Sequence, residues 1–410
     1  MRVTGDTRAT APEKAALPSD VGRAWASLLS SGDAIADEIT LTLLDHDKDW
    51  YDHADPEIRA DLRRSTRDHI RLGLRAMAGD EDFDTLLALW RETGRRRARQ
   101  GVPLELVLNA YTIGTRVLWE ALVRRQTDPV LQVDDHVLLV AGRKVWSNLD
   151  VQNSVMSAAY RKESALLQRR DLHRQGRLLD GLVEGRGSDP AFAAEVQEVL
   201  GVAPDDAVAC VVAAFDGDRD SPLRNPDDRL DGAGLASYWQ VRGDLHFGLV
   251  QLGSAAVVDV VQLLRPCTSG RVGVAASPEG LTGFCTAFQL AAHTVDTIPR
   301  GTAEVADGEE RLPKVLLAAS PAITALLVRR SIGPVLAQPA HQAEVLMTTL
   351  RALLAHHGSP THAAQDLYCH RNTVIYRMRQ LQALTGRDLA DPEDRLLLML
   401  ALLAVDPITP

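Results

Sequence analysis

One segment near the C-terminus constrains the fold more than any other part of the chain. Residues 367–387 contain four arginines and no acidic residue, although the whole chain has 45 basic and 55 acidic residues. Within the segment, apolar residues recur at helical spacing and form one stripe. The stripe consists of Val374, Ile375, Met378 and Leu381. We therefore predict an amphipathic helix whose outer face carries guanidinium, amide and hydroxyl groups but no carboxylate.

A second, shorter helix is predicted directly before this one. Ser359 is placed to cap it, and Pro360 suits its first helical position. The linking residues Tyr368 and Cys369 leave room only for a tight turn. Two short helices joined in this way form a helix-turn-helix, whose second helix lies in the major groove of DNA.

The predicted second helix supplies the candidate DNA-contacting residues. They are His370, Arg371, Asn372, Thr373, Tyr376, Arg377 and Arg379. Arg371 and Asn372 lie on the first turn, where arginine can bind guanine and asparagine can bind adenine with two hydrogen bonds each. We expect phosphate contacts from Thr373, Arg377 and Arg379. His370 is expected to cap the helix, and Tyr376 either faces DNA or packs on a neighbouring helix.

Around this motif the sequence resembles the C-terminal domain of the PucR/CdaR class of bacterial transcriptional regulators. The resemblance runs from Leu346 to Leu403, and its most specific part is the run from His370 to Arg377, His-Arg-Asn-Thr-Val-Ile-Tyr-Arg. Further matching runs are Leu346–Leu350, Ala363-Ala364, Leu384–Leu389 and Asp391–Leu396. The resemblance implies a regulator that binds double-stranded DNA and is not an enzyme.

Length and charge limit the alternatives. A chain of 410 residues suggests two to four domains, and a net charge of −10 excludes general binding to polyanions. Residues 341–410 hold six arginines, no lysine and seven carboxylates. DNA affinity must therefore come from a placed cluster of arginines and not from a basic domain.

The cysteines and the hydropathy point to the cytoplasm. Cys210, Cys267, Cys285 and Cys369 share no close spacing, which argues against a zinc site and fits a reducing compartment. No run of eighteen apolar residues occurs, so we expect neither a membrane span nor a signal peptide. No cofactor is expected.

The N-terminal part is predicted to be all-α. Residues 1–18 are expected to form a disordered tail, and residues 19–160 a sensor-like bundle of about five helices, because apolar residues recur there at intervals of three and four. The run Pro103–Tyr111, followed by Arg116 and Trp119, resembles the N-terminal domains of PucR-type regulators related to Rsb-type stress-signalling proteins. The same spacing would also arise in a plain amphipathic core helix.

Two clusters in this part could be read as binding sites. Residues 45–53 have the residue types of a metal site, but they are nearly consecutive, and we interpret them as a polar interhelical loop. The arginines of residues 95–99 could contact phosphate, but consecutive arginines splay around a helix. We interpret them as a solvated face.

Residues 155–185 are predicted to form one long polar helix with a thin apolar seam. The seam consists of Val155, Ala159, Leu166, Leu172, Leu179 and Leu182. Such a helix is suited to connect domains over residues 161–185 and to form a homodimer, although an ordinary surface helix is the alternative.

The pattern of apolar runs in residues 186–312 predicts an α+β domain. We predict a strand over 208–215, a hairpin with strands at 237–241 and 246–252, a helix over 257–264, a strand over 271–276 and a helix over 280–295. This order is ferredoxin-like, and the region is similar to the degenerate GGDEF-like domain of the same regulator class. A diguanylate cyclase would need paired glycines and a glutamate at the hairpin, which here reads Val241–Phe247 without them. The acidic run 216–220 resembles the start of a calcium-binding loop. It has Ser221 where such a loop needs glycine at the sixth position, so we interpret it as an ordinary loop.

The remaining residues complete the DNA-binding part. Residues 313–340 are predicted to form two short linking helices, and residues 341–410 the all-α helix-turn-helix domain. Leu346, Leu350, Leu353 and Leu354 should pack one side of its core. Leu396, Leu397, Leu400 and Leu403 should close the other side.

The sequence therefore predicts a multidomain, mainly α protein that regulates transcription in response to an unknown small molecule or partner. The alternative is a nucleotide cyclase or phosphodiesterase that uses the middle domain. The hairpin disfavours this alternative, because it lacks the catalytic glycines and the acid.

Overall fold

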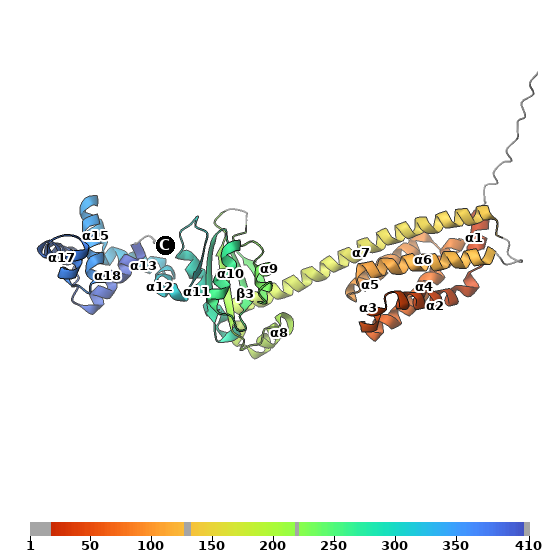
Figure 1. The fold of residues 1–410 in the computed structure, drawn as a ribbon, viewed down its shortest axis with the longest axis horizontal. Helices are drawn as coiled ribbons and strands as arrows, with labels where there is room; N and C mark the ends of the chain where they lie inside the picture. Colours follow the sequence, from red (N-terminus) through yellow and green to blue (C-terminus); the bar gives the residue numbers. More distant parts are fainter. Residues whose placement is uncertain (1–17, 127–132, 218–220, 406–410) are drawn as a thin grey trace, which may run out of the picture. The chain divides into compact units, whose positions relative to one another are not determined.

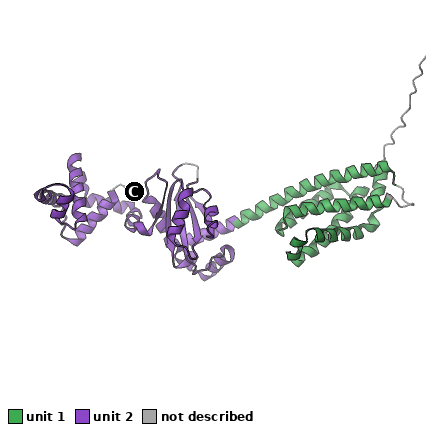
Figure 2. Ribbon diagram, viewed as in Figure 1, with its two compact units in different colours: residues 1–171 green, residues 172–410 purple. Residues whose placement is uncertain are grey.

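The computed structural model describes residues 18–126, 133–217 and 221–405. The predicted tail over residues 1–18 therefore lies outside the described residues, except for Pro18, where the first helix begins. The chain divides into two compact units, residues 1–171 and 172–410, which Figure 2 shows in different colours.

The first unit is a bundle of helices, as predicted (Figure 1). Its helices are α1 (Pro18–Ala26), α2 (Gly32–His46), α3 (Lys48–His53), α4 (Pro56–Ala78), α5 (Phe83–Arg99), α6 (Leu104–Gln126) and the first part of α7 (Asp135–Val183). The core residues Trp25, Leu74 and Leu122 are fully buried. The prediction of an all-α N-terminal region is confirmed.

Helix α4 shows how the sequence sets the limits of a helix. The carboxylate of Asp55 accepts a hydrogen bond from the backbone N–H of Glu57 at 2.8 Å, and Pro56 occupies the first helical position. The helix ends at Gly79, whose φ of 95° lies in the left-handed region that glycine adopts without strain. Together these caps fix the frame of α4, the helix that carries Asp61, Ser65 and His69.

The prediction for the arginines of residues 95–99 is wrong in part. Arg97 is only 5% exposed, and its guanidinium lies 2.9 Å from the carboxylate of Asp61 on α4. Arg96 donates to the hydroxyl of Ser65 at 3.1 Å. The helix turns Arg97 inward because a carboxylate on the facing helix compensates the buried charge, and the spacing within α5 alone could not reveal that partner.

The interpretation of residues 45–53 as an interhelical loop is wrong for most of them, because α2 extends to His46 and Lys48–His53 form α3. Polar groups of this segment are engaged within the protein. The ring nitrogen Nδ1 of His53 lies 2.7 Å from the backbone carbonyl of Asp49, and Asp47 accepts a hydrogen bond from Asn109 at 3.2 Å. Within the described residues, no three or more potential ligands are grouped as a metal site would require.

Helix α7 spans 49 residues and includes the predicted helix over 155–185 except for its last two residues, since α7 ends at Val183. The seam residues differ in their surroundings. Leu179 and Leu182 are fully buried in the core of the second unit, whereas Leu166 and Leu172 are 42% and 64% exposed. The exposed part of the seam is therefore the part that is free to meet another surface.

The second unit contains one five-stranded sheet. Its strands are β1 (Val208–Ala214), β2 (Ser237–Arg242), β3 (Leu245–Gln251), β4 (Arg271–Ser277) and β5 (Glu304–Asp307), in the order β2-β3-β1-β4-β5. All neighbouring strands are antiparallel except β4 and β5. The first four strands have the predicted ferredoxin-like arrangement, and β5 is an addition that the sequence analysis did not contain.

The central strand β1 explains why its sequence is continuously apolar. Alternate side chains point to opposite faces of a strand. Val208, Cys210 and Val212 enter the hydrophobic cluster that includes α11 (Phe284–Asp296), while Ala209 and Val211 enter the cluster that includes α10 (Val257–Leu264). Both faces of β1 are therefore covered by apolar groups.

Other elements of this region agree closely with the predictions. The hairpin turn is Gly243-Asp244, with Gly243 at a φ of 62° and Arg242 paired with Leu245. The predicted helix over 280–295 is α11, preceded by the short turn η4 (Gly280–Gly283). Two further helices, α8 (Pro190–Leu200) and α9 (Pro226–Asp231), were not predicted.

The acidic run that imitates a calcium loop begins with a residue that already has a partner. Arg271, which is buried, holds Asp216 through two hydrogen bonds of 2.6 and 2.8 Å. The guanidinium of Arg271, first through its hydrogen bonds, lowers the pKa of Asp216 below its ordinary value. Residues 218–220 of this run lie outside the described residues.

The C-terminal region is all-α. Its helices are α12 (Leu312–Ala318), α13 (Pro321–Ser331), α14 (Gly333–Leu336), α15 (Ala340–Ala355), α16 (Pro360–Asp366), α17 (Arg371–Thr385) and α18 (Pro392–Val405). The linking segment thus forms three helices where two were predicted. Ile332 and Val335 from this segment lie in the same hydrophobic cluster as α15, α16, α17 and α18.

The packing prediction is confirmed for α15 and wrong for α18. All four predicted leucines of α15 are buried. In α18 the buried residues are Leu398, Ala401 and Leu402, whereas the predicted Leu396 is 55% exposed. The apolar run over residues 396–403 has no polar side, so its periodicity could not indicate which face turns inward.

In the described part of the chain, no single helix is both long and apolar enough to cross a membrane. One bent pair, Glu309–Ala318 with Pro321–Ser331, passes the same test of length and composition when its two helices are taken together.

Candidate nucleic-acid interface

The helix-turn-helix is formed by α16, a short turn and α17. Ser359 and Pro360 begin α16 as predicted, although the Ser359 hydroxyl makes no cap hydrogen bond. The turn is closed by the backbone N–H of Cys369, which donates to the carbonyl of Ala364 at 3.1 Å. Tyr368 adopts a left-handed φ of 49° in this turn. This sharp change of direction allows the second helix to begin three residues later, at Arg371.

The start of α17 is set by His370. Its ring nitrogen Nδ1 accepts a hydrogen bond from the backbone N–H of Asn372 at 3.2 Å, so His370 is the cap that we expected. A cap satisfies one of the free N–H groups at a helix start. His370 therefore orients the first turn of α17, on which Arg371 and Asn372 lie.

The inner face of α17 is fixed to the domain core. Val374 and Leu381 are buried, and Met378 packs against the same cluster. At its end, Arg387 forms an ion pair with Asp394 of α18 at 2.8 Å. A hydrogen bond from the backbone N–H of Asp388 and another from Arg387 lower the pKa of Asp394, which therefore stays ionised. These contacts fix which side of α17 turns outward.

The outer face carries three residues separated by four and three positions. Asn372, Tyr376 and Arg379 are all exposed and share one side of the helix. Tyr376 is 67% exposed, so it does not pack on a neighbouring helix, and the open alternative is resolved in favour of an outward position. Arg371 is also exposed, at the first position of the helix.

Arg377 and Thr373 lie differently from the other predicted residues. Both are only half-exposed, and the guanidinium of Arg377 donates to the hydroxyl of Thr349 on α15 at 3.4 Å. Thr349 itself is fully buried. Arg377 therefore lies at the edge of the outer face and partly supports the packing of α17 on α15.

The charge on the outer face is not compensated nearby. No acidic residue lies on α17. Among the described residues, neither Arg371 nor Arg379 has an ion pair or a side-chain hydrogen bond. The neighbouring acids are engaged elsewhere: Asp366 lies 2.6 Å from His356, and Asp388 accepts from Gln382 at 2.9 Å. The arrangement can therefore bind an anion or an acceptor-rich surface without first breaking internal contacts.

One exposed residue at this surface was not among the predicted site residues. Tyr368, in the turn between the two helices, is 97% exposed. From the sequence, Tyr368 was predicted only to be part of the turn. Its position directly before the second helix was the only available signal.

Three family models match parts of this chain, in agreement with this architecture. Residues 346–404 match the family model of the PucR C-terminal helix-turn-helix domain. Residues 184–297 match the model of the GGDEF-like domain, and residues 33–175 match the N-terminal domain of the RsbT co-antagonist protein rsbRD.

Known proteins share shorter parts of the sequence. The chain is 45% identical over 82 residues to an "Uncharacterized protein in pkwA 5'region" of Thermomonospora curvata, which covers 20% of this chain and 45% of that protein. It is 42% identical over 67 residues to the purine catabolism regulatory protein of Bacillus subtilis, covering 16% and 13%. It is 43% identical over 58 residues to the carbohydrate diacid regulator of Escherichia coli, covering 14% and 15%.

The chain thus spans less than half the length of each of these relatives. A solved structure of a regulator of polyketide synthase expression from Bifidobacterium adolescentis has 19% sequence identity and a TM-score of 0.32. That alignment covers 57% of this chain and 97% of the other.

The C-terminal region is therefore a helix-turn-helix domain, by its geometry and by its sequence. It is of the PucR type, and the same chain carries a GGDEF-like domain and an rsbRD-type N-terminal domain.

Proposed function

We propose that this protein is a sequence-specific DNA-binding transcriptional regulator. The observation that carries the proposal is the outer face of α17, which is rich in arginine, free of acids and exposed on a PucR-type helix-turn-helix. Direct readout in the major groove needs hydrogen-bonding side chains on the first turns of such a helix. The relatives named as regulators support the same assignment.

Within this proposal the residues of α17 divide the work. Arg371 and Asn372 read base edges from the first turn, while Arg379 and Thr373 contact phosphate. Tyr376 faces DNA between these groups, and His370 acts mainly by orienting the first turn. Arg377 contacts phosphate as well, at the cost of loosening its hydrogen bond to Thr349.

We further propose that the protein acts as a homodimer. The support is the pair of exposed leucines on α7, Leu166 and Leu172, which a second copy could cover. Two recognition helices would then bind two half-sites spaced by a helical turn of DNA. Light scattering on the full chain should give the mass of a dimer, and replacing both leucines by lysine should give a monomer. A wild-type monomer both with and without DNA would contradict this proposal.

The middle domain is proposed to be regulatory and not catalytic, and the signal to be a small molecule or a partner. The support is the hairpin, which has Gly243 and Asp244 at its turn but lacks the paired glycines and the glutamate of an active cyclase. Incubation with GTP and magnesium should yield no cyclic dinucleotide. Turnover that Asp244→Ala abolishes would overturn this part.

We propose the domain organisation that was predicted from the sequence. It assigns residues 19–160 to the sensor, 161–185 to the connector, 186–312 to the GGDEF-like domain, 313–340 to the linking helices and 341–410 to DNA binding. The protein would work in the cytoplasm, where its DNA is.

Selection of binding sites from random duplex DNA tests the main proposal. The full chain should enrich one motif, and Arg371→Ala with Asn372→Ala should lose it. The control is Arg63→Ala, which removes one positive charge from an exposed position on α4. Failure of the wild-type chain to enrich any motif, at low as well as physiological salt, would overturn the proposal.

A further inference from the structure

A cavity of about 140 Å³ in the N-terminal bundle is lined by residues of α2, α3, α4, α5, α6 and α7 and is partly open to solvent. Its volume is close to that of an engineered apolar protein cavity of roughly 150 Å³, which binds benzene. A void of this size therefore has room for one small ring compound.

Most of the cavity wall is apolar. Leu43, Leu86, Trp90 and Leu118 line it, and all four are buried. Such a wall favours a flat or compact hydrocarbon ring, because ligand sites gain most of their affinity from apolar contact and their specificity from a few placed polar groups.

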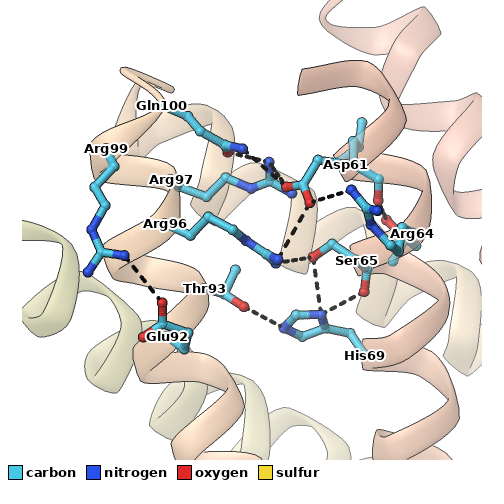
Figure 3. Close-up of polar contacts among 12 residues, drawn as sticks. Asp61, Arg64, Ser65, His69, Glu92, Thr93, Arg96, Arg97, Arg99 and Gln100 are labelled. Carbon is cyan, nitrogen blue, oxygen red and sulfur yellow. Dashed lines mark hydrogen bonds and ion pairs between the residues drawn. The ribbon is translucent and has the colours of Figure 1, made fainter. Parts of the chain in front are cut away.

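The placed polar groups gather on one part of the wall. His69 of α4, Thr93 of α5 and Tyr111 of α6 all line the cavity and contact one another (Figure 3 shows His69 and Thr93). The ring nitrogen Nε2 of His69 lies 2.8 Å from the Tyr111 hydroxyl and 3.2 Å from the Thr93 hydroxyl. Its other nitrogen, Nδ1, lies 2.7 Å from the backbone carbonyl of Ser65.

The hydrogen-bonding pattern leaves one hydroxyl proton that the ring of His69 does not accept. A carbonyl only accepts, so Nδ1 of His69 must carry the proton and Nε2 must accept. Burial lowers the pKa of His69 to about 4, so the ring is neutral near pH 7. Nε2 has a single lone pair and can take the proton of only one of the two hydroxyls. The other, on Tyr111 or Thr93, can donate to its neighbour or to a ligand.

Positive charge gathers beside this part of the wall, where Arg97 is the arginine that lines the cavity. Arg97 lies 2.9 Å from Asp61, while Arg96 and Arg64 each lie 3.5 Å from the same carboxylate. Figure 3 shows the arginines gathered around Asp61. Three cations thus share one anion, and a second carboxylate near Arg97 would be attracted.

From these observations we propose that the N-terminal bundle binds a small monocyclic aromatic carboxylate, with its ring among the leucines and its carboxylate toward Arg97 and the two hydroxyls. This assignment rests on the proposed function and deepens it, because it gives the regulator a site and a chemical class for its signal. The cavity wall includes Leu149 of α7, the helix that continues to Val183. A ligand that contacts Leu149 can therefore affect the packing of that helix.

The chain offers a variant that fills the cavity with little risk to folding. Gly73 lines the cavity in the interior of α4. Apart from its chain neighbours and the nearby backbone of its own helix, no atom lies within 4 Å of the position that a Cβ would take there. A larger residue in place of a helical glycine also favours the helix. Gly73→Leu should block the site, and Gly73→Ala is the matched control.

The experiment is calorimetric titration of the full chain with benzoate, without DNA. We expect saturable binding of one benzoate per chain, at least a tenfold loss in Gly73→Leu and a change of less than about twofold in Gly73→Ala. Tyr111→Phe, which keeps the ring, should weaken benzoate about tenfold and toluene hardly at all.

Absence of saturable benzoate binding, or equal binding by Gly73→Leu, would overturn the assignment. If toluene binds the wild type as tightly as benzoate, the proposed recognition of the carboxylate by Arg97 and the two hydroxyls is wrong. A chain that selects a DNA motif but does not bind benzoate contradicts only this inference. A chain that binds benzoate but selects no DNA contradicts only the proposed function.

Discussion

Helices α5 and α17 both carry clustered arginines, and they use the same side chain in opposite ways. At the end of α5, Arg97 is buried against Asp61, and Arg99 pairs with Glu163 at 2.8 Å. On α17, Arg371 and Arg379 are exposed and have no acidic neighbour on their helix. An arginine cluster is therefore structural or functional according to the carboxylates within its reach.

Whether an arginine is paired with a carboxylate can be seen only when the residue that faces it in the fold is known. Arg97 and Asp61 lie on different helices, 36 positions apart in the sequence, and nothing in the order of residues joins them. The absence of acids from residues 367–387 is, in contrast, a local property. The sequence therefore supported a correct prediction of the acid-free helix α17, whereas the prediction for the arginines of α5 was wrong in part.

The largest expected effect is the loss of stability when the buried ion pair of Arg97 and Asp61 is broken. Asp61→Ala leaves the charge of Arg97 buried without a partner, which costs roughly 3–5 kcal/mol of unfolding free energy. Five of the six tryptophans lie in the first unit, so urea unfolding followed by tryptophan fluorescence reports on this bundle. The control is Asp37→Ala, whose partner Arg67 is exposed, and it should cost less than about 1 kcal/mol. Equal losses in both variants would refute the distinction.

The next effect concerns α17 and should leave stability unchanged. Arg371→Ala or Asn372→Ala should weaken binding to a selected DNA site by roughly 1–3 kcal/mol, since each removes a bidentate contact to one base. Their unfolding curves should match that of the wild type, because both side chains are exposed. Fluorescence anisotropy with labelled DNA measures the affinity. A destabilised Arg371→Ala would mean that this arginine, like Arg97, supports the fold.

A smaller effect is expected of pH on the stability of the N-terminal bundle. The pKa of His69 is lowered to about 4 by burial first and by Arg96 and Arg97 next, against an ordinary value of 6.5. The unfolded chain therefore binds a proton between pH 6.5 and 4 that the folded chain does not, so the bundle loses stability as the pH falls through this window. The slope is at most about 1.4 kcal/mol per pH unit, and less because the ring is only half-buried.

His69→Gln checks the origin of that slope. The variant should flatten the pH dependence of tryptophan-monitored unfolding between pH 6.5 and 4. The pKa of Asp61 is also lowered, because the charge of Arg97, the hydrogen bond from Gln100 and the charges of Arg96 and Arg64 outweigh the effect of burial. Its contribution to stability is lost mainly below the lower end of this window. An unchanged slope would show that His69 is not the titrating group.

The smallest effect distinguishes two arginines of α17. Arg379→Ala should reduce the slope of log affinity against log salt by about 0.9, the value for one lost phosphate contact. Arg377→Ala should reduce it less, because its guanidinium is partly held by Thr349. Thr349→Val, which removes the tether and keeps the shape, serves as a control for that contact. A larger change for Arg377 than for Arg379 would reverse the proposed roles.

Much of the fold was predictable where local patterns decide it. The start of α16 at Pro360, the hairpin turn at Gly243 and the leucines of α15 follow from short-range rules. The face of α18 was not predictable, because residues 396–403 are apolar on every side. The strand β5 has only four residues and pairs with one neighbour, so its sequence carries little signal.

The candidate site was predictable in its location and less so in its details. The outward position of Asn372, Tyr376 and Arg379 follows from helical spacing. The hydrogen bond from Arg377 to Thr349 depends on how α15 and α17 pack, which residue order does not encode locally. The cavity in the bundle was missed for the same reason, since its wall is assembled from several helices.

The central claim is that the first turn of α17 reads bases. The most direct test measures the affinity of the wild type and of Arg371→Ala for a selected DNA site and for every single-base variant of it. The account predicts that Arg371→Ala loses its preference at one base pair of each half-site and keeps the preference elsewhere. A profile and an affinity that Arg371→Ala leaves unchanged would contradict the placement of α17 in the major groove.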